Sequence, residues 1–283
     1  MKEYRLTDWL PTTKKEVELR GWDELDVILF SGDAYVDHPS FGAAVIGRIL
    51  EAEGLRVAIV PQPNWRDDLR DFRKLGRPRL FFGISAGCMD SMVNKYTANK
   101  RLRSDDAYTP DGRPDMRPEY PSIVYTQILK KLYPDVPVVL GGIEASMRRL
   151  SHYDYWQDRL KKSILCESGA DMLIYGMGEK PICELVRRLT ALCDNQDGVI
   201  SSSDIHSPAL SSIPQTAYLT RKYESDENDI TLYSHEECLA DKKKQATNFR
   251  HIEEESNKYA AARIVQAVDG KTVVVKPPYP PMT

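Results

Sequence analysis

The stretch that decides the fold is Val27-Ile28-Leu29-Phe30-Ser31-Gly32-Asp33. Its apolar first half predicts a short buried strand, and the small and acidic residues after it predict a turn. Apolar residues at helical spacing follow over residues 43–53 and stop at Gly54. A strand, a loop and a helix in this order form the unit from which parallel sheets are built.

The same unit recurs along the chain. An excursion over residues 95–118, rich in charge and proline, interrupts it and is predicted to be irregular. We predict an α/β fold over residues 1–192, with a flavodoxin-like (Rossmann-like) doubly wound parallel sheet of about five strands. Further strands are predicted at 56–60, 79–83, 137–140 and 171–175, and helices at 68–75, 119–133 and 179–192.

The C-terminal third has a different composition. Residues 193–212 are rich in serine and aspartate, which is typical of a linker. We predict a linker and an α+β extension over residues 193–276, and a proline-rich connector to a further domain over 277–283. The extension is predicted to hold strands at 216–219 and 272–275 and polar helical sequence at 234–262.

Bulk properties exclude several classes of function. The formal net charge is −3 and the pI is about 6.0, so we expect no nucleic-acid partner. No stretch approaches the roughly 18 apolar residues of a membrane span, and we expect a cytoplasmic protein without membrane contact. The five cysteines are scattered without a CxxC or CxxxCxxC spacing, so no metal site is predicted in this chain.

Ligands of open parallel sheets bind beyond the carboxyl ends of the strands, where the winding direction changes. Glycine in the turns there lets a ligand approach the backbone, and helix starts offer free N–H groups. This set of turns fits either a polyphosphate or a tetrapyrrole. Since the sequence has no GxGxxG motif, it does not decide between the two ligands. The predicted cofactor-binding residues are Asp33, His38, Ser85, Gly141, Gly142, Gly176, Gly178 and Glu179.

Two enzymatic alternatives use the same turns. Gly83-Ile84-Ser85-Ala86-Gly87 satisfies the GxSxG pattern of serine hydrolases, and Asp171 and His206 follow in the order acid, then base. Against this alternative, His206 lies in the predicted linker rather than after a strand. Asp33 also occupies the position of a response-regulator phosphoacceptor, although the accompanying acidic residues and lysine of such a site are not evident.

Four runs are too long and too particular to be generic turns: Gly32–Gly42, Asp90–Thr97, Arg103–Pro110 and Arg148–Trp156. In these runs the sequence resembles the YgiQ family of radical SAM proteins. The resemblance extends from Trp9-Leu10-Pro11 to the terminal prolines, which is almost the whole chain.

The resemblance implies an N-terminal Rossmann-like domain of the cobalamin-binding type. In such proteins a TIM-barrel-like core follows, whose CxxxCxxC cysteines hold a four-iron four-sulfur cluster that cleaves S-adenosylmethionine. That core is expected beyond Thr283, as the partner on which this chain docks, so cluster and S-adenosylmethionine are expected only there. The chain alone is therefore expected to be inactive.

The resemblance also implies that cobalamin is a possible ligand of this chain, held by the predicted turns. The DxHxxG motif that supplies a cobalt ligand in methionine-synthase-like domains is not matched, because His38 lies four residues before Gly42. We therefore expect no protein ligand to cobalt. A pure interaction domain, with Tyr96–Pro118 and Arg148–Trp156 as its contact surface, is a further alternative.

Overall fold

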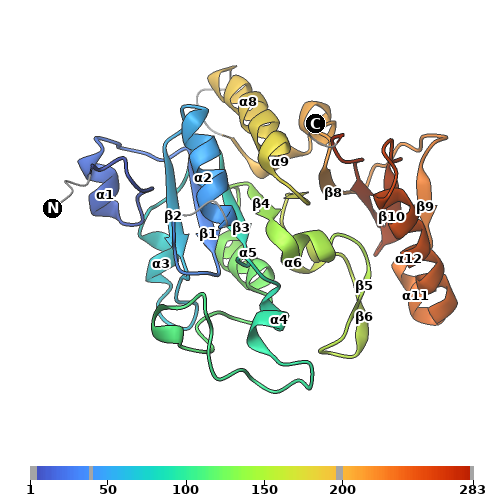
Figure 1. The fold of residues 1–283 in the computed structure, drawn as a ribbon. Coiled ribbons are helices and arrows are strands. Elements are labelled where there is room, and N and C mark those ends of the chain that lie inside the picture. The colour runs from blue at the N-terminus through green and yellow to red at the C-terminus, as the bar shows by residue number, and fades with distance from the viewer. Residues whose placement is uncertain (1–4, 38–40, 196–199, 281–283) are drawn as a thin grey trace.

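The computed structural model describes residues 5–37, 41–195 and 200–280, and is built on one nine-stranded sheet (Figure 1). Five of its strands are parallel and adjacent, in the order β2-β1-β3-β4-β7. The winding direction therefore changes between β1 and β3, as in doubly wound sheets. These strands are β1 (Val27–Ser31), β2 (Val57–Pro61), β3 (Phe81–Ser85), β4 (Val138–Gly141) and β7 (Met172–Ile174).

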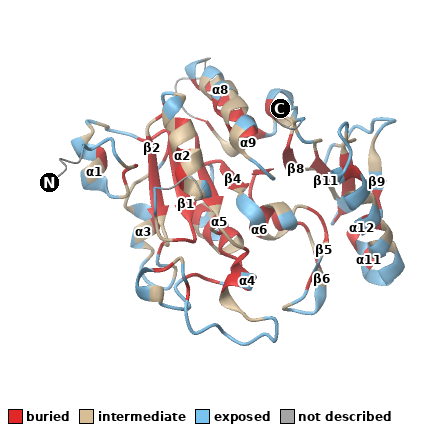
Figure 2. Ribbon diagram, in the orientation of Figure 1, coloured by how far each residue is buried: buried red, intermediate tan, exposed pale blue. Residues whose placement is uncertain are grey.

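The parallel strands are apolar because both faces of the sheet are covered. Every residue of β1 is buried: Ile28 and Phe30 belong to one core, and Val27 and Leu29 to the other. Helices α3 and α5 contribute to the first core, and α2 and α8 to the second, as the buried inner faces in Figure 2 indicate. These helices are α2 (Gly42–Ala52), α3 (Arg70–Arg73), α5 (Pro121–Leu132) and α8 (Glu179–Asn195).

The sheet is wider than predicted. The predicted sheet of about five strands corresponds to β2-β1-β3-β4-β7, but the C-terminal segment adds four more strands in the order β8-β11-β10-β9, of which β10 and β9 also pair in parallel. β8 pairs with β7 antiparallel, so the predicted extension continues the same sheet; the division near residue 192 stays a prediction. The four strands are β8 (Thr216–Thr220), β9 (Ile230–Leu232), β10 (Ile264–Val268) and β11 (Lys271–Val275).

Sequence periodicity missed β9 and β10 because short apolar runs flanked by polar sequence give a weak signal. The polar segment predicted as helical over 234–262 forms two helices, and the second of them ends at Ser256.

No helix in the described ranges is long and apolar enough to cross a membrane. The remaining elements are α1 (Lys14–Leu19), α4 (Ser91–Lys95), the short 3-10 helix η1 (Pro110–Gly112), α6 (Gly142–Met147), β5 (His152–Asp154), β6 (Arg159–Lys161), α7 (Ile164–Ser168), α9 (Ser202–Ile205), α10 (Pro208–Ser211), α11 (His235–Ala240) and α12 (Lys242–Ser256).

The excursion over residues 95–118 is irregular, as predicted, and one arginine pins it to the sheet. Arg117 is only 1% exposed. Its guanidinium donates to the carboxylate of Asp33, just beyond β1, at 2.6 Å, and to that of Asp106 at 2.8 Å. Two carboxylates on one buried cation give charge-assisted bonds that fix the loop with little freedom.

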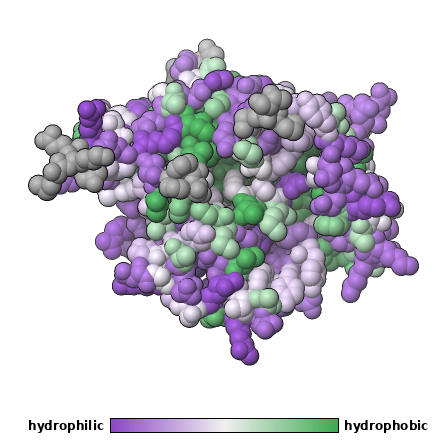
Figure 3. Space-filling model, in the orientation of Figure 1, coloured by the Kyte–Doolittle hydropathy of each residue, from purple (hydrophilic) through white to green (hydrophobic). Residues whose placement is uncertain are grey.

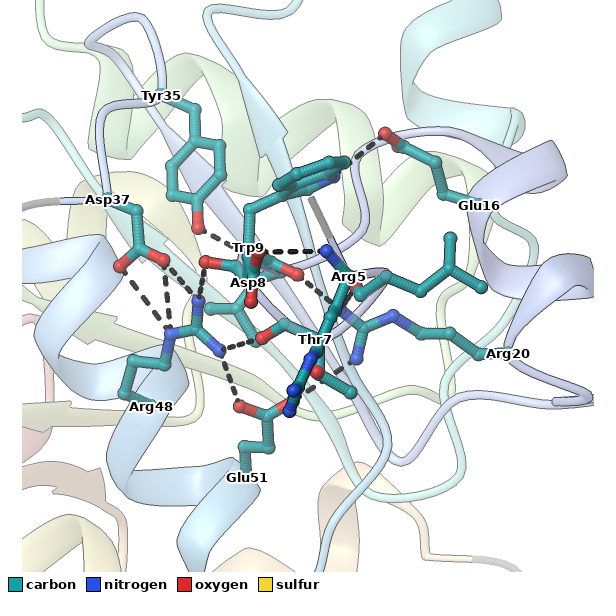
Figure 4. Close-up of polar contacts among 12 residues, drawn as sticks. Arg5, Thr7, Asp8, Trp9, Glu16, Arg20, Tyr35, Asp37, Arg48 and Glu51 are labelled. Carbon is teal, nitrogen blue, oxygen red and sulfur yellow. Dashed lines mark hydrogen bonds and ion pairs between the residues drawn. The ribbon is translucent and has the colours of Figure 1, made fainter. Parts of the chain in front are cut away.

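A second polar cluster holds the N-terminal segment and the loop after β1 against α2 (Figure 4). Arg48 on α2 donates to the carbonyl oxygens of Thr7 at 3.2 Å and Asp8 at 2.7 Å. The same guanidinium pairs with Asp37 and, at 2.8 Å, with Glu51. The chain on both sides of β1 is thereby tied to one helix.

Replacing Arg117 tests how far the excursion depends on it. Arg117→Met leaves Asp33 and Asp106 buried without their cation, so we expect the free energy of unfolding to fall by about 3–5 kcal/mol. Arg113→Met is the matched control, since that arginine is exposed and pairs only at the surface; its effect should stay within about 0.5 kcal/mol. Urea unfolding of both variants measures the difference, and equal stabilities would contradict the pinning role.

The ion pair between Arg117 and Asp106 also predicts how the stability of the fold depends on pH. Burial alone raises the pKa of Asp106, but hydrogen bonds from the Tyr108 N–H and Arg117 outweigh it, so the folded-state pKa is lowered. Because the pKa of Asp106 is lower in the folded protein than the value of about 3.9 in the unfolded chain, its ionised carboxylate stabilises the fold fully above about pH 3.9. This stabilisation is lost as the pH falls through the folded-state pKa. The stability gap between wild type and Arg117→Met should therefore narrow below about pH 4. A constant gap in urea titrations at pH 7 and at acid pH would exclude this linkage.

Candidate functional site

A cavity of about 330 Å³ lies at the carboxyl edge of the parallel strands, between α2 and α8. It adjoins the point where the winding direction changes, where ligands of such sheets bind. Six of the eight predicted residues line it: Ser85, Gly141, Gly142, Gly176, Gly178 and Glu179.

Glycines shape this cavity in two different ways. Gly142 has a φ of +82°, and a Cβ there would stand 2.7 Å from the Ser85 Oγ, so the turn after β4 requires glycine. A Cβ on Gly178 would make only ordinary contacts, 3.4 Å from Ile174 and 3.6 Å from Ile46. Gly178 therefore leaves space that the fold does not need.

The walls are mainly apolar, with one carboxylate oxygen that lacks a hydrogen-bond partner among the described residues. Ile46 from α2 and Ile182 from α8 face the cavity. At its rim Met177 is 65% exposed, and Figure 3 shows apolar surface in the middle of this face. Glu179 begins α8, and its Oε2 is buried without a hydrogen-bond partner in the described part of the chain. A buried acceptor of this kind favours a ligand that brings a donor.

The two other predicted residues are placed differently. Asp33 does not line the cavity: it is 2% exposed, and its carboxylate bonds to Arg117 and to the Cys88 N–H, at 2.6 Å in each case. A carboxylate so enclosed is inaccessible to a phosphate donor, which contradicts the response-regulator alternative. His38 lies outside the described residues.

The serine-hydrolase alternative is wrong. Ser85 ends β3 at the carboxyl edge, and its Oγ accepts a hydrogen bond from the Gly87 N–H at 3.2 Å. Asp171 precedes β7 at the opposite edge, where its carboxylate is bound by Lys130 at 2.5 Å and by the Val138 N–H at 2.7 Å. Since these strands are parallel, the acid and the serine lie at opposite ends and cannot form a triad.

The two segments predicted as an interaction surface lie against each other. The rings of Tyr96 and Trp156 have centroids 5.4 Å apart, and the Tyr155 hydroxyl donates to the Ala98 oxygen at 2.8 Å. Tyr155 and Leu102 are nevertheless exposed, so this surface is not covered within the described chain.

Sequence patterns missed a buried polar network beneath the edge. Glu144 on α6 accepts from the Ser91 N–H at 3.3 Å and the Ser122 N–H at 3.1 Å, which ties the starts of α4 and α5 together. Its burial raises the pKa of Glu144. Asp90 caps α4 through the Met92 N–H and pairs with Arg148. The available signal was that Asp90 and Arg148 both lie in the runs that carry the family resemblance.

Comparison with known proteins gives the family. The family model described as Radical SAM N-terminal matches residues 9–283. A UPF0313 protein of Bacteroides thetaiotaomicron is 80% identical over 285 residues, covering 100% of this chain and 46% of that protein. A UPF0313 protein of Geobacter sulfurreducens is 46% identical over 97% of this chain and 43% of its own length.

The UPF0313 protein YgiQ of Escherichia coli is 56% identical over 181 residues, which is 64% of this chain and 24% of that protein. This chain thus spans less than half the length of these curated relatives.

One solved structure is similar at low level. It is the radical S-adenosylmethionine methyltransferase TsrM from Kitasatospora setae, with cobalamin and an iron–sulfur cluster bound; the TM-score is 0.37 and the identity 20%, over 68% of this chain and 26% of that chain. The family assignment depends instead on the family model and the curated relatives. On that evidence the chain belongs to the Radical SAM N-terminal family, in the UPF0313 group that includes YgiQ.

Proposed function

We propose that this chain is an accessory, cofactor-binding part of a radical SAM iron–sulfur protein, that its carboxyl-edge cavity binds a corrinoid of the cobalamin kind, and that it is not catalytic alone. The observation that carries the proposal is the cavity itself, which combines glycine turns, apolar walls and the free Glu179 oxygen at the switch point of the sheet. The cluster and S-adenosylmethionine are assigned to the catalytic core of the whole protein.

The residues present fit part of a corrinoid. The amide groups on the periphery of a corrin carry the N–H donors that the buried Glu179 oxygen lacks. At about 330 Å³ the cavity is at the small end of ligand cavities, so we infer that it holds an appendage, with the exposed Met177 at its rim available to the larger ring. Bound cobalamin supplies cobalt-centred radical or group-transfer chemistry.

This chain's own contribution is binding and orientation. Backbone at Gly141 and Gly176 permits close approach, and Glu179 fixes a donor group of the ligand. No histidine lines the cavity in the described part of the chain, so we propose binding without a cobalt ligand from these residues.

We also propose that the catalytic core contacts the surface made by Tyr96–Pro118 and Arg148–Trp156. Exposed aromatic and apolar side chains, Tyr153, Tyr155 and Leu102 among them, support this assignment, since such groups are typical of protein contacts. The surface is adjacent to α6, which also borders the cofactor cavity. A core docked there would lie close to the bound cofactor.

Titration with hydroxocobalamin, followed by corrinoid absorption and calorimetry, tests the proposed ligand. We expect saturable binding, and at least about tenfold weaker binding for Gly178→Val, because the added methyl groups occupy the cavity without backbone strain. Ala240→Val, on the exposed end of α11, is the control and should bind as wild type. Absence of saturable binding to the wild type at high micromolar ligand would refute the corrinoid assignment.

Removing the free carboxylate tests its role separately. Glu179→Ala should weaken hydroxocobalamin binding about tenfold, the effect of one hydrogen bond to a charged group. Glu184→Ala, on the same helix and paired with Arg188, should leave the affinity unchanged. Melting curves of both variants report folding, and equal affinities would mean that Glu179 does not contact the ligand.

A further inference from the structure

A second, larger cavity of about 1250 Å³ lies away from the proposed cofactor site. One wall is the segment from Met147 to Leu160, which includes the β5–β6 hairpin; the other wall is α11 and α12. Figure 1 shows the hairpin beside these two helices. Elements distant in sequence thus enclose a space that shares the segment Arg148–Trp156 with the surface proposed for the core, and the proposed function assigns no ligand to it.

Unsatisfied polar atoms concentrate on this cavity. Four of its lining residues have a buried side-chain atom without a hydrogen-bond partner among the described residues: Arg148 Nε, Arg149 Nε, His152 Nε2 and Gln245 Oε1. Buried polar groups in folded proteins are paired as a rule, so a cluster of exceptions around one cavity favours a ligand with complementary polar groups there. Two of the atoms are donors and two are acceptors.

Four basic and four acidic side chains line the cavity, so the case for an anion depends on Arg149 and not on the total charge. Asp90 neutralises Arg148, but Arg149 forms no ion pair with any described residue; its guanidinium donates to the Ser146 oxygen at 2.7 Å and lies 4.9 Å from the Tyr175 ring centroid. Arg159 and Lys242 add two further cations without ion pairs in the described part of the chain.

The acids around the cavity balance its charge in number, but none of them forms an ion pair with Arg149 among the described residues. Asp154 accepts from the Tyr120 hydroxyl at 2.6 Å and from the Gln157 N–H at 2.8 Å, and Asp158 is bound by Tyr153. Glu253 on α12 is exposed and forms no ion pair with the described residues, although its charge offsets part of the lowering of the Arg149 pKa by burial. A half-buried guanidinium without a hydrogen-bonded carboxylate is costly, and an anionic ligand bound directly to Arg149 lowers that cost.

The acceptors and the apolar wall define the rest of the ligand. His152 Nδ1 donates to the Leu150 oxygen at 3.1 Å, which leaves Nε2 as an acceptor, and burial lowers the pKa of His152 to about 4, so the ring is neutral near pH 7. Gln245 donates through its Nε2 to the Ser151 oxygen, so its Oε1 remains as an acceptor for a ligand. Phe249, 60% exposed, and the exposed Leu239 and Met147 give an apolar wall.

We propose that this cavity binds an amphiphilic organic anion: a carboxylate or phosphate at Arg149, hydroxyl or amide donors toward His152 and Gln245, and an apolar or aromatic body against Phe249. The site is independent of the cofactor cavity, and such an anion is a candidate substrate or product of the whole protein.

The aromatic anion 1-anilinonaphthalene-8-sulfonate is the probe, because its fluorescence rises in apolar sites. We expect saturable binding that weakens about tenfold in Arg149→Gln, recovers in part in Arg149→Lys, and weakens in Phe249→Ser. Arg113→Gln, an exposed arginine far from the cavity in sequence, is the control and should bind as wild type. Gly178→Val should also bind as wild type, which separates this site from the cofactor cavity.

Competition then identifies the anionic group. Displacement by 1-naphthoate and by 1-naphthyl phosphate distinguishes a carboxylate from a phosphate preference, and neutral 1-naphthol should displace the probe poorly. Absence of a saturable signal in the wild type would overturn the proposal. Binding that is unchanged in Arg149→Gln, or displacement by 1-naphthol as efficient as by the anions, would overturn it equally, since the apolar wall alone would then attract the probe.

Discussion

The buried guanidinium of Arg117 is the interaction on which the carboxyl edge of this sheet depends. It bonds to Asp33, just beyond β1, and to Asp106 in the middle of a long irregular excursion. An irregular loop has few backbone hydrogen bonds to hold it, so its position is set by such charge-assisted contacts. The Arg117 cation thereby holds the excursion against the carboxyl end of β1.

Further polar contacts of the same kind complete the edge. Glu144 joins the starts of α4 and α5, and Asp90 joins α4 to Arg148. These residues lie mainly in the runs that carry the resemblance to the YgiQ family, so part of what makes those runs particular is the fixing of loops rather than contact with a ligand. The glycine turns have the other role: they keep space open beside the apolar walls between α2 and α8.

The two cavities differ in the side chains that line them, and the two proposals accordingly assign them different ligands. The smaller one is apolar, lies at the switch point of the sheet and offers one free carboxylate oxygen. The larger one is rich in arginine and aromatic side chains and lies between the hairpin and the C-terminal helices. A cofactor in the first and an anionic substrate in the second would both lie within a radical SAM protein's N-terminal part, near the surface proposed for its core.

The sequence by itself determined the parallel part of the sheet, its helices, the irregular excursion and the turns that meet at the carboxyl edge, because these depend on local apolar period and on glycine. Only the tertiary structure decided that four more strands widen the sheet, that Asp171 and Ser85 lie at opposite edges, and that Asp33 is an ion-pair partner of Arg117 rather than a cavity residue. Asp33 and Arg117 are separated by 84 positions in the chain. Pairings over such distances follow from how elements pack, and no local pattern of residues encodes them.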